Sequence, residues 1–345
     1  MSSDSRAAFE TVRVARSDDG LRLDRWFRQH FPHVTNGHLQ KLLRKGQVRV
    51  DAKRAAANQR VEAGNEVRVP PAVRNPETSA QAGKRPTPKP PLGVSKADRA
   101  LIDGLVLFED DDVLVLNKPQ GLAVQGGSGT RRHIDGMLMG MSDRFGDRPR
   151  LVHRLDRDTT GVLLVAKSRK AAAALGAVFQ SRAAAKTYWA LVTGVPRPAQ
   201  GEVAAALVKA AGPEGDRVRK ARPGEQDRAM HATTHYAVIE RAGTKTAWVS
   251  LKPTTGRQHQ LRAHMAILGH PIVGDPKYDG GMDLPAENMP AKLHLHARRL
   301  VIPHPSGQGT IDVSAPLPPH MRESFALLGL DASRYDASAS TERAS

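Results

Sequence analysis

Three short segments combine residue types that could support acid–base or nucleophilic chemistry, and the first surrounds Asp156. In the segment LVHRLDRDTTGVLLVAKS at 151–168, Asp156 lies in a polar turn just before the apolar run 162–166. A carboxylate that projects from the edge of a strand could act as a nucleophile or as a general base. An aspartate in such a turn more often bonds the local backbone, so this position alone does not identify a reaction.

The other two segments carry a tyrosine and an arginine. The run KTYWALV at 186–192 alternates, so Lys186, Tyr188 and Ala190 share one face of a predicted strand. In the segment 251–275, a turn at Thr255 precedes Arg257, which stands at the start of a predicted helix. A packing tyrosine and a structural arginine are the usual interpretations of these two residues. Each segment by itself therefore leaves the chemistry open.

Composition limits the class of partner. The 345 residues allow two domains, or one large domain with an appendage. Lys and Arg number 52 against 35 Asp and Glu, which gives a net charge of +17. This charge favours nucleic acid as the binding partner over an anionic membrane. The alternative is that the excess of cations only keeps the protein in solution. No apolar run approaches the ~20 residues of a spanning helix, and the start lacks an apolar signal region. Cysteine is absent, which suits a reducing cytoplasm.

Histidines raise the alternative of metal catalysis. The spacing disfavours it, because the His-Glu-x-x-His pattern of helical zinc ligands is missing and the histidines lie among arginines. Phosphate-binding glycine motifs are missing as well. We therefore expect no metal, and we expect polar packing or RNA contacts for His259, His264, His270, His294 and His296.

The elements that must position these residues follow from apolar periodicity. Strands are predicted at 105–109, 113–118, 162–166, 186–194, 234–240 and 246–252. Helices are predicted at 171–182, 258–269 and 316–330. Because strands and helices do not alternate strictly, we expect an α+β catalytic domain at 99–330, on a mixed, largely antiparallel sheet flanked by helices. The polar segment 210–230 is expected to be an exposed loop, and 331–345 a disordered tail.

The residues before the catalytic domain predict a small αβ module at 20–70. Leu23, Trp26 and Phe27 recur at helical spacing, and Asn36 can cap a second helix that ends at Gly46. The following residues alternate as two short strands around a polar turn. A basic, proline-rich linker is predicted at 71–98. Five cationic residues of the module could follow phosphate oxygens, although a solvated charged face is the alternative: Arg22, Arg25, Lys41, Arg44 and Lys45.

The sequence of this module resembles a known RNA-binding unit. The stretches LRLDRWF, HLQKLLRKGQVRVDAK and EAGNEVRVP are similar to the module shared by a small-subunit ribosomal protein, tyrosyl-tRNA synthetases and several RNA-modifying enzymes. The resemblance covers about fifty residues. Such modules hold RNA by its shape and backbone. The resemblance therefore implies delivery to RNA and no chemistry.

Four motifs after the linker resemble the catalytic core of ribosomal RNA pseudouridine synthases. The stretches LNKPQGLAVQGG, HRLDRDTTGVLLVAK, KTYWALV and LKPTTGRQHQLRAH occur in the family's order across roughly residues 105–305. The resemblance implies that Asp156 is the essential aspartate, that Tyr188 packs on the target base and that Arg257 pairs with the aspartate. It also implies that Arg154 enters the RNA where the target base has left.

The order of module, linker and GGSG segment is most similar to the RluC subgroup, which acts on large-subunit ribosomal RNA. Many relatives in that subgroup have His where this chain has Gln125, so any role of that His is not transferred. Isomerising uridine breaks the N1–C1′ bond and joins C5 to C1′ with no net redox change, so no cofactor is expected. The resemblance leaves open whether the carboxylate attacks the base or the sugar, or removes a sugar proton.

Two alternative functions remain at this point. One is a noncatalytic ribosome-assembly protein that only binds RNA, and the other is a pseudouridine synthase acting on another RNA. The joint presence of Asp156, Tyr188 and Arg257 weighs against a scaffold, because RNA contacts alone do not need that trio. We expect ribosomal RNA as the partner, with no membrane and no protein partner evident.

Overall fold

The structure is a computed structural model that describes residues 9–73, 95–126, 130, 132–210 and 217–335. The chain divides into two compact units, Met1–Lys89 and Pro90–Ser345. Each unit has apolar clusters of its own. We describe the two units separately.

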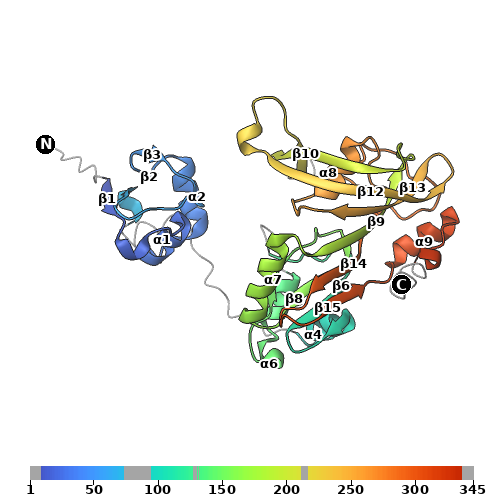
Figure 1. Cartoon of the computed structure of the whole chain (residues 1–345), viewed down its shortest axis with the longest axis horizontal. Helices are drawn as coiled ribbons and strands as arrows, with labels where there is room; N and C mark the ends of the chain where they lie inside the picture. Colours follow the sequence, from blue (N-terminus) through green and yellow to red (C-terminus); the bar gives the residue numbers. More distant parts are fainter. Residues whose placement is uncertain (1–8, 74–94, 127–129, 131, 211–216, 336–345) are drawn as a thin grey trace. The chain divides into compact units, whose positions relative to one another are not determined.

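Within its described residues, the first unit contains two helices and a four-stranded antiparallel sheet (Figure 1). Its helices are α1 (Leu23–His30) and α2 (Asn36–Arg44), preceded by the short turn η1 (Arg16–Asp18). Its strands are β1 (Glu10–Arg13), β2 (Arg49–Val50), β3 (Lys53–Arg54) and β4 (Glu66–Val69), in the order β1-β4-β2-β3, and η2 (Pro71–Val73) follows β4. Trp26, Phe27 and Leu39 lie in its apolar core.

Two details of this unit differ from the sequence-based prediction. The cap of α2 is Thr35, whose Oγ1 accepts a hydrogen bond from the His38 N–H at 3.2 Å, while Asn36 is the first residue of the helix. The unit also begins before residue 20, because β1 pairs with β4. A strand of four residues has too little periodicity to be recognised without its partner.

The second unit is built on an eleven-stranded sheet within the described residues. The strand order is β11-β10-β12-β13-β9-β14-β8-β6-β5, with β15 paired to β14 and β7 paired to β8. All pairings are antiparallel except that of β14 with β8. The predicted α+β class with a mixed, largely antiparallel sheet is therefore confirmed.

The bounds of the eleven strands are as follows: β5 Val106–Glu109, β6 Val113–Lys118, β7 Arg150–Leu151, β8 Thr160–Ala166, β9 Ala185–Thr193, β10 Gln200–Ala210, β11 Arg217–Lys220, β12 Met230–Ala242, β13 Thr246–Pro253, β14 Leu295–Pro303 and β15 Thr310–Ser314. Every residue of β8 is buried, as expected for a strand near the middle of the sheet.

Helices cover different parts of this sheet (Figure 1). The helices are α4 (Lys96–Gly104), α5 (Ile134–Met139), α6 (Ser142–Phe145), α7 (Arg169–Ser181), α8 (Gln260–Ile267) and α9 (Pro319–Leu328), and a short turn η3 spans Gln226–Arg228. Helix α7 contacts β7 and β8, whereas α8 contacts β10, β11 and β12. Helix α9 packs Met321 and Phe325 against Trp189 and Trp248.

Three segments differ from their sequence-based expectations. The segment 210–230, expected as a loop, contains β11 and η3, and its residues 211–216 lie outside the described residues. Helix α4 begins inside the predicted linker 71–98, of which residues 74–94 lie outside the described part. The tail was expected to be disordered from residue 331. Instead, Tyr335 donates a hydrogen bond to the Ile239 carbonyl at 2.9 Å and packs its ring on Trp248, while 336–345 are not described.

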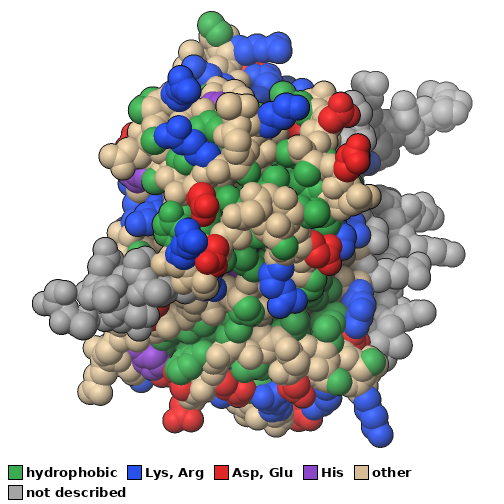
Figure 2. Space-filling view, turned by 90° about the vertical axis from the view of Figure 1, so that its right-hand side faces the viewer, with side chains coloured by type: hydrophobic (Ala, Val, Ile, Leu, Met, Phe, Trp, Pro, Cys, Tyr) green, Lys and Arg blue, Asp and Glu red, His purple; other side chains and the backbone are tan. Residues whose placement is uncertain are grey.

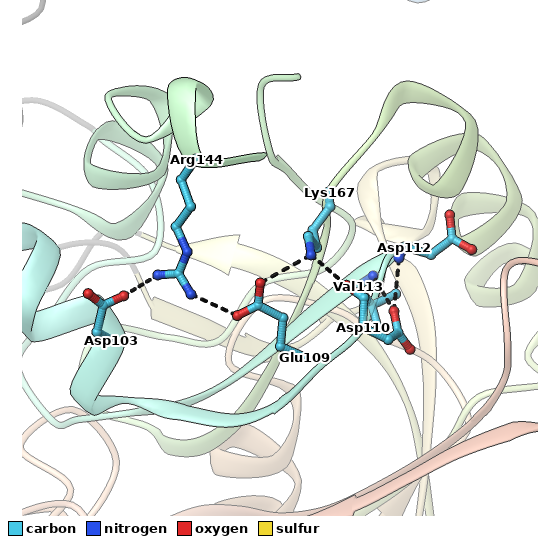
Figure 3. Close-up of polar contacts among 7 residues, drawn as sticks. All are labelled: Asp103, Glu109, Asp110, Asp112, Val113, Arg144 and Lys167. Carbon is cyan, nitrogen blue, oxygen red and sulfur yellow. Dashed lines mark hydrogen bonds and ion pairs between the residues drawn. The ribbon is translucent and has the colours of Figure 1, made fainter. Parts of the chain in front are cut away.

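A charged network joins α6, β5 and the residue after β8 (Figure 3). Arg144 forms ion pairs with Asp103 and, at 2.8 Å, with Glu109. Lys167 donates to Glu109 at 3.1 Å and to the Asp110 carbonyl at 2.5 Å. The Asp110 carboxylate accepts two backbone N–H groups at 2.9 and 2.8 Å, which closes the turn between β5 and β6. Because these groups are partly exposed, their main effect is on local geometry.

Candidate active site

A cleft of about 1280 Å³ opens in the second unit where the starts of β9 and α8 meet the end of β13 and the loop before β8. Among the described residues, its lining includes eight cationic side chains: Arg154, Arg182, Lys186, Lys209, Lys252, Arg257, Arg262 and Arg299. Asp156 is the single carboxylate in this lining. On the face of the molecule shown in Figure 2, basic and acidic side chains are interspersed. The cleft therefore suits a polyanion and offers it one acidic group.

Asp156 lies in the loop between β7 and β8, and its side chain is 19% exposed. Buried Lys118, the last residue of β6, holds this loop in place. Its ammonium donates to the carbonyls of Pro119, Leu122 and Arg157 at 2.9, 2.8 and 2.8 Å. Burial lowers the pKa of Lys118 to about 7, while the nearby aspartates oppose that shift. Three acceptors match the three N–H groups of the charged form, so the charged lysine satisfies them all.

The cation that faces Asp156 is Arg262, and it comes from α8. Its Nη1 lies 3.7 Å from the Asp156 Oδ2, and its side chain is 4% exposed. Its Nε and Nη2 bind the two oxygens of buried Asp275 at 2.7 and 2.6 Å. This bidentate pair fixes the plane of the guanidinium beside Asp156.

Arg262 thus occupies the place beside Asp156 that the resemblance implied for Arg257. Arg257 is exposed, lines the cleft and donates from Nε to the His231 carbonyl at 3.3 Å. It precedes α8, whereas Arg262 lies within α8 and points into the protein. Both arginines belong to one motif, and the sequence alone did not show which one faces the carboxylate. Arg257 remains a candidate for contact with RNA.

His259 is a second neighbour of Asp156 that the resemblance did not single out. Its Nε2 lies 3.9 Å from the Asp156 Oδ2, and its Nδ1 lies 3.1 Å from the Tyr278 hydroxyl. Burial lowers the pKa of His259, and the charge of Asp156 opposes that shift. His259 caps α8 with a φ of 51°, a left-handed conformation that is uncommon outside glycine.

Gln260 holds the turn that places His259. Its side-chain oxygen accepts from the Thr255 hydroxyl at 2.7 Å and from the Arg257 N–H at 3.0 Å. Its amide nitrogen donates to the Thr233 carbonyl at 2.9 Å and to the Thr234 hydroxyl at 3.0 Å. These bonds tie the start of α8 to β12, which makes the left-handed residue part of a fixed loop.

Tyr188 reaches the same cleft from β9. It lies opposite Leu251 of β13 and Ala297 of β14, and its side chain is partly buried. Burial raises the pKa of the Tyr188 hydroxyl, and the charge of Asp156 adds to that shift. The structure thus brings Tyr188 and Asp156 together in one cleft, and the tyrosine stays neutral.

Arg154 and His153 begin the loop that carries Asp156. Arg154 is exposed and lines the cleft. The His153 ring accepts a hydrogen bond from the Leu164 N–H of β8 at 2.8 Å and stacks on Phe179 with ring centroids 5.0 Å apart. Burial lowers the pKa of His153 to about 3, which keeps it a neutral acceptor. His153 therefore fixes the start of the loop.

The cationic residues proposed for RNA binding in the first unit are all exposed: Arg22, Arg25, Lys41, Arg44 and Lys45. The last three share one face of α2 or its end, because their spacing is three to four residues. Arg22 is partly committed to Asp24, at 2.6 Å. Gln125, which replaces the subgroup's usual His, is exposed and is not part of the described cleft lining.

The histidines considered as metal ligands serve other contacts. His264, His294 and His296 are buried, and they face the hydroxyls of Thr234, Ser324 and Thr160 at 2.9, 2.7 and 2.8 Å. Over the described ranges, no group of three His, Cys, Asp or Glu residues is arranged to hold a metal ion. Over the same ranges, no helix has both the length and the apolarity needed to cross a membrane.

Comparison with known proteins identifies the family of the chain. Residues 112–267 match the family described as RNA pseudouridylate synthase. The ribosomal large subunit pseudouridine synthase C of Vibrio cholerae is 34% identical over 93% of this chain and 97% of its own length. The protein of the same name from Escherichia coli K12 is 36% identical over 89% and 92%. The solved structure of human RNA pseudouridylate synthase domain containing 4 is 30% identical, with a TM-score of 0.57, and covers 68% of this chain and 98% of that one.

Fold, cleft and sequence matches thus define an enzyme that modifies RNA without net redox change. The chain belongs to the RNA pseudouridylate synthase family, whose members convert uridine to pseudouridine.

Proposed function

We propose that this enzyme isomerises uridines of large-subunit ribosomal RNA, with Asp156 as its catalytic carboxylate. The observation that carries the proposal is the place of Asp156, the single carboxylate in the described lining of a basic cleft, 3.7 Å from buried Arg262. The choice of RNA is supported by bacterial relatives named for the large ribosomal subunit.

The charged form of Asp156 is the reactive one in this proposal. The guanidinium of Arg262 lies beside this carboxylate and is held in that position by Asp275. The carboxylate then attacks the base or the sugar, or removes a sugar proton. Each of these routes requires the Asp156 carboxylate. None of them requires a cofactor, because the N1–C1′ bond is replaced by a C5–C1′ bond without net oxidation.

Tyr188 and Arg154 handle the target base. A stacked uridine cannot rotate inside RNA, so it must leave the stack at a cost of a few kcal/mol. The Tyr188 ring beside Asp156 offers a surface on which the extruded base can pack, worth about 1–3 kcal/mol. Arg154 is exposed at the same cleft and is suited to occupy the gap left in the RNA.

The first unit serves to bind RNA in this proposal. Its support is the exposed basic face of α2 and the resemblance of its sequence to known RNA-binding modules. Contacts of this kind follow the phosphate backbone and carry no sequence information. A cytoplasmic location is part of the proposal, since the chain has no cysteine that would need oxidising conditions.

The test is pseudouridine mapping of ribosomal RNA from cells with and without the gene. We expect one or more large-subunit sites to disappear, to return with the wild-type protein and to stay absent with Asp156→Asn. Loss confined to transfer RNA or to the small subunit would reject the proposed substrate. A site restored by Asp156→Asn would reject the catalytic role of Asp156.

A further inference from the structure

We propose that His259 is a positioning residue for Asp156, and that a hydrogen-bond relay from the Val218 backbone through the Tyr278 hydroxyl fixes its neutral Nε2–H tautomer. The inference rests on the proposed role of Asp156. In addition to that role, the inference places the N–H dipole of His259 toward the carboxylate. It also connects the active site to strand β11 through hydrogen bonds.

The tautomer follows from the partners of the two ring nitrogens, because Nε2 faces a carboxylate, which can only accept, and Nδ1 faces a hydroxyl that can donate. The Val218 N–H can only donate, and it donates to the Tyr278 oxygen at 2.7 Å. The single proton of the Tyr278 hydroxyl is then available to His259 Nδ1, 3.1 Å away. An Nδ1 that accepts carries no proton, so the proton of the neutral imidazole sits on Nε2. Nε2 is the atom that faces the Asp156 Oδ2 at 3.9 Å.

Burial is the main reason why the ring is neutral, and the surrounding charges act in both directions. The groups that act on His259 are Asp156 and Asp275, which favour its protonated form, and Arg262 and Lys277, which oppose it. Burial opposes protonation most strongly and lowers the pKa of His259. A neutral N–H donor orients a nearby carboxylate without adding a second full charge beside Arg262.

The backbone also supports a dedicated position for this ring. His259 takes a left-handed conformation, and Gln260 and Thr255 hold the surrounding turn. Non-glycine residues in this region cluster at functional sites, where the surrounding structure maintains them. The guanidinium of Arg262 lies over the Tyr278 ring, 5.2 Å from its centroid, so the relay and the cation pack as one unit.

The relay begins in β11, which pairs with a strand that reaches the cleft. Val218 of β11 lies opposite Lys209 of β10, and Lys209 lines the cleft. RNA held at this edge can therefore influence the hydroxyl of Tyr278 and, through it, the ring beside Asp156. We infer that β11 helps to set the geometry of the reacting group when RNA is bound.

The first test reads the tautomer without measuring activity. The full-length protein is labelled with ¹⁵N in the histidine rings, and the His259 resonances are assigned by their loss in His259→Gln. We expect the Nε2–H tautomer at neutral pH, and a mixture of tautomers in Tyr278→Phe. An Nδ1–H tautomer or a charged ring in the wild-type protein would overturn the proposal, whatever the enzyme's substrate.

The second test separates positioning from folding by single-turnover rates at saturating RNA. His259→Gln keeps a donor and an acceptor in place and should retain most of the rate, whereas His259→Leu has neither and should lose about tenfold or more. Tyr278→Phe should also slow turnover while RNA affinity stays unchanged. The control is Tyr236→Phe, which removes a hydroxyl bound to the Pro198 carbonyl outside the cleft.

The outcomes distinguish this inference from the proposed function. Equal rates for His259→Gln and His259→Leu, with both proteins folded by circular dichroism, would reject the positioning role. Normal turnover by Asp156→Asn would reject the proposed function while leaving the tautomer measurement intact. A slow Tyr236→Phe would show that the loss in Tyr278→Phe reflects general destabilisation and would count against the relay.

Discussion

The Nη1 atom of Arg262 lies 3.7 Å from the Oδ2 atom of Asp156, while the rest of the same guanidinium is bound to Asp275. The cation beside the candidate catalytic carboxylate is thus held by a second, fully buried carboxylate. Arg262 has little freedom to move when RNA enters. This arrangement provides a fixed electrostatic environment for Asp156 in place of a flexible surface ion pair.

Replacing Asp156 by Asn should abolish isomerisation and leave RNA binding nearly intact. The change keeps the shape of the side chain and removes its charge. Tritium release from RNA labelled at uridine C5 measures the reaction directly, and filter binding measures affinity. Asp111→Asn, at an exposed position outside the cleft, is the matched control. Normal tritium release by Asp156→Asn would exclude this carboxylate.

Arg262 and Arg257 should respond differently to substitution. Arg262→Gln leaves buried Asp275 without its arginine partner, which should cost about 3–5 kcal/mol of folding free energy and stop turnover. The pair Arg262→Gln with Asp275→Asn should recover much of the stability but not the activity. Arg257→Gln should fold normally and weaken RNA binding, with a smaller salt dependence. Urea denaturation measures the stability of each variant, and turnover assays measure its activity. Equal losses of stability in Arg262→Gln and Arg257→Gln would contradict the different roles assigned to these arginines.

Substitution of Tyr188 separates stacking from hydroxyl chemistry. Tyr188→Phe keeps the ring, so RNA affinity should change little. Tyr188→Ala removes the ring and should lose about 1–3 kcal/mol of base stacking. Affinity for an RNA that carries the target uridine measures the difference. If both variants bind equally well and both lose turnover, the hydroxyl group is the important part of Tyr188.

Stability should fall on acidification because of buried neutral histidines. Burial lowers the pKa of His264, His294 and His296 from 6.5 to about 4. Between these values the unfolded chain binds protons that the folded chain does not, so stability is lost as pH falls from 6.5 toward 4. Each group contributes up to about 1.4 kcal/mol per pH unit. Urea midpoints across this range should show a shallower slope for His296→Gln than for exposed His235→Gln.

The basic face of α2 should contribute to affinity but not to chemistry. The triple change of Lys41, Arg44 and Lys45 to Gln removes three cations that release counterions from RNA. The slope of log affinity against log salt should become shallower, and the rate at saturating RNA should be unchanged. Affinities at several salt concentrations and single-turnover rates test both points. An unchanged slope, or a lost rate at saturation, would show that this face is not an independent RNA-binding surface.

Much of the fold was predictable because periodicity reports local burial. The strands at 113–118, 186–194 and 246–252 correspond to β6, β9 and β13, since apolar runs and alternating patterns are both typical of strands in a packed sheet. Strand β11 was missed because three of its four residues are charged and Val218 alone is apolar, which is too short a pattern to indicate a strand. The order at Tyr335 was missed for a similar reason, because it depends on distant Trp248.

The candidate site was only partly predictable. The resemblance of the motifs to a known family singled out Asp156, Tyr188 and Arg154 as site residues. The structure brings all three to one cleft. The resemblance assigned Arg257 to the carboxylate, whereas the structure places Arg262 beside it. That depends on where α8 begins, and the buried contacts of Gln260 set the preceding turn.

The sequence by itself determined the class of the enzyme, its basic character and the residue types available for chemistry, because these are properties of composition and motif. Only the tertiary structure decided which groups face one another. Lys118, His259, Asp275 and Tyr278 come from separate parts of the chain, and their contacts around Asp156 arise when β6, α8 and the loop after α8 pack together. Distances between side chains far apart in sequence depend on that packing, which local residue patterns do not encode.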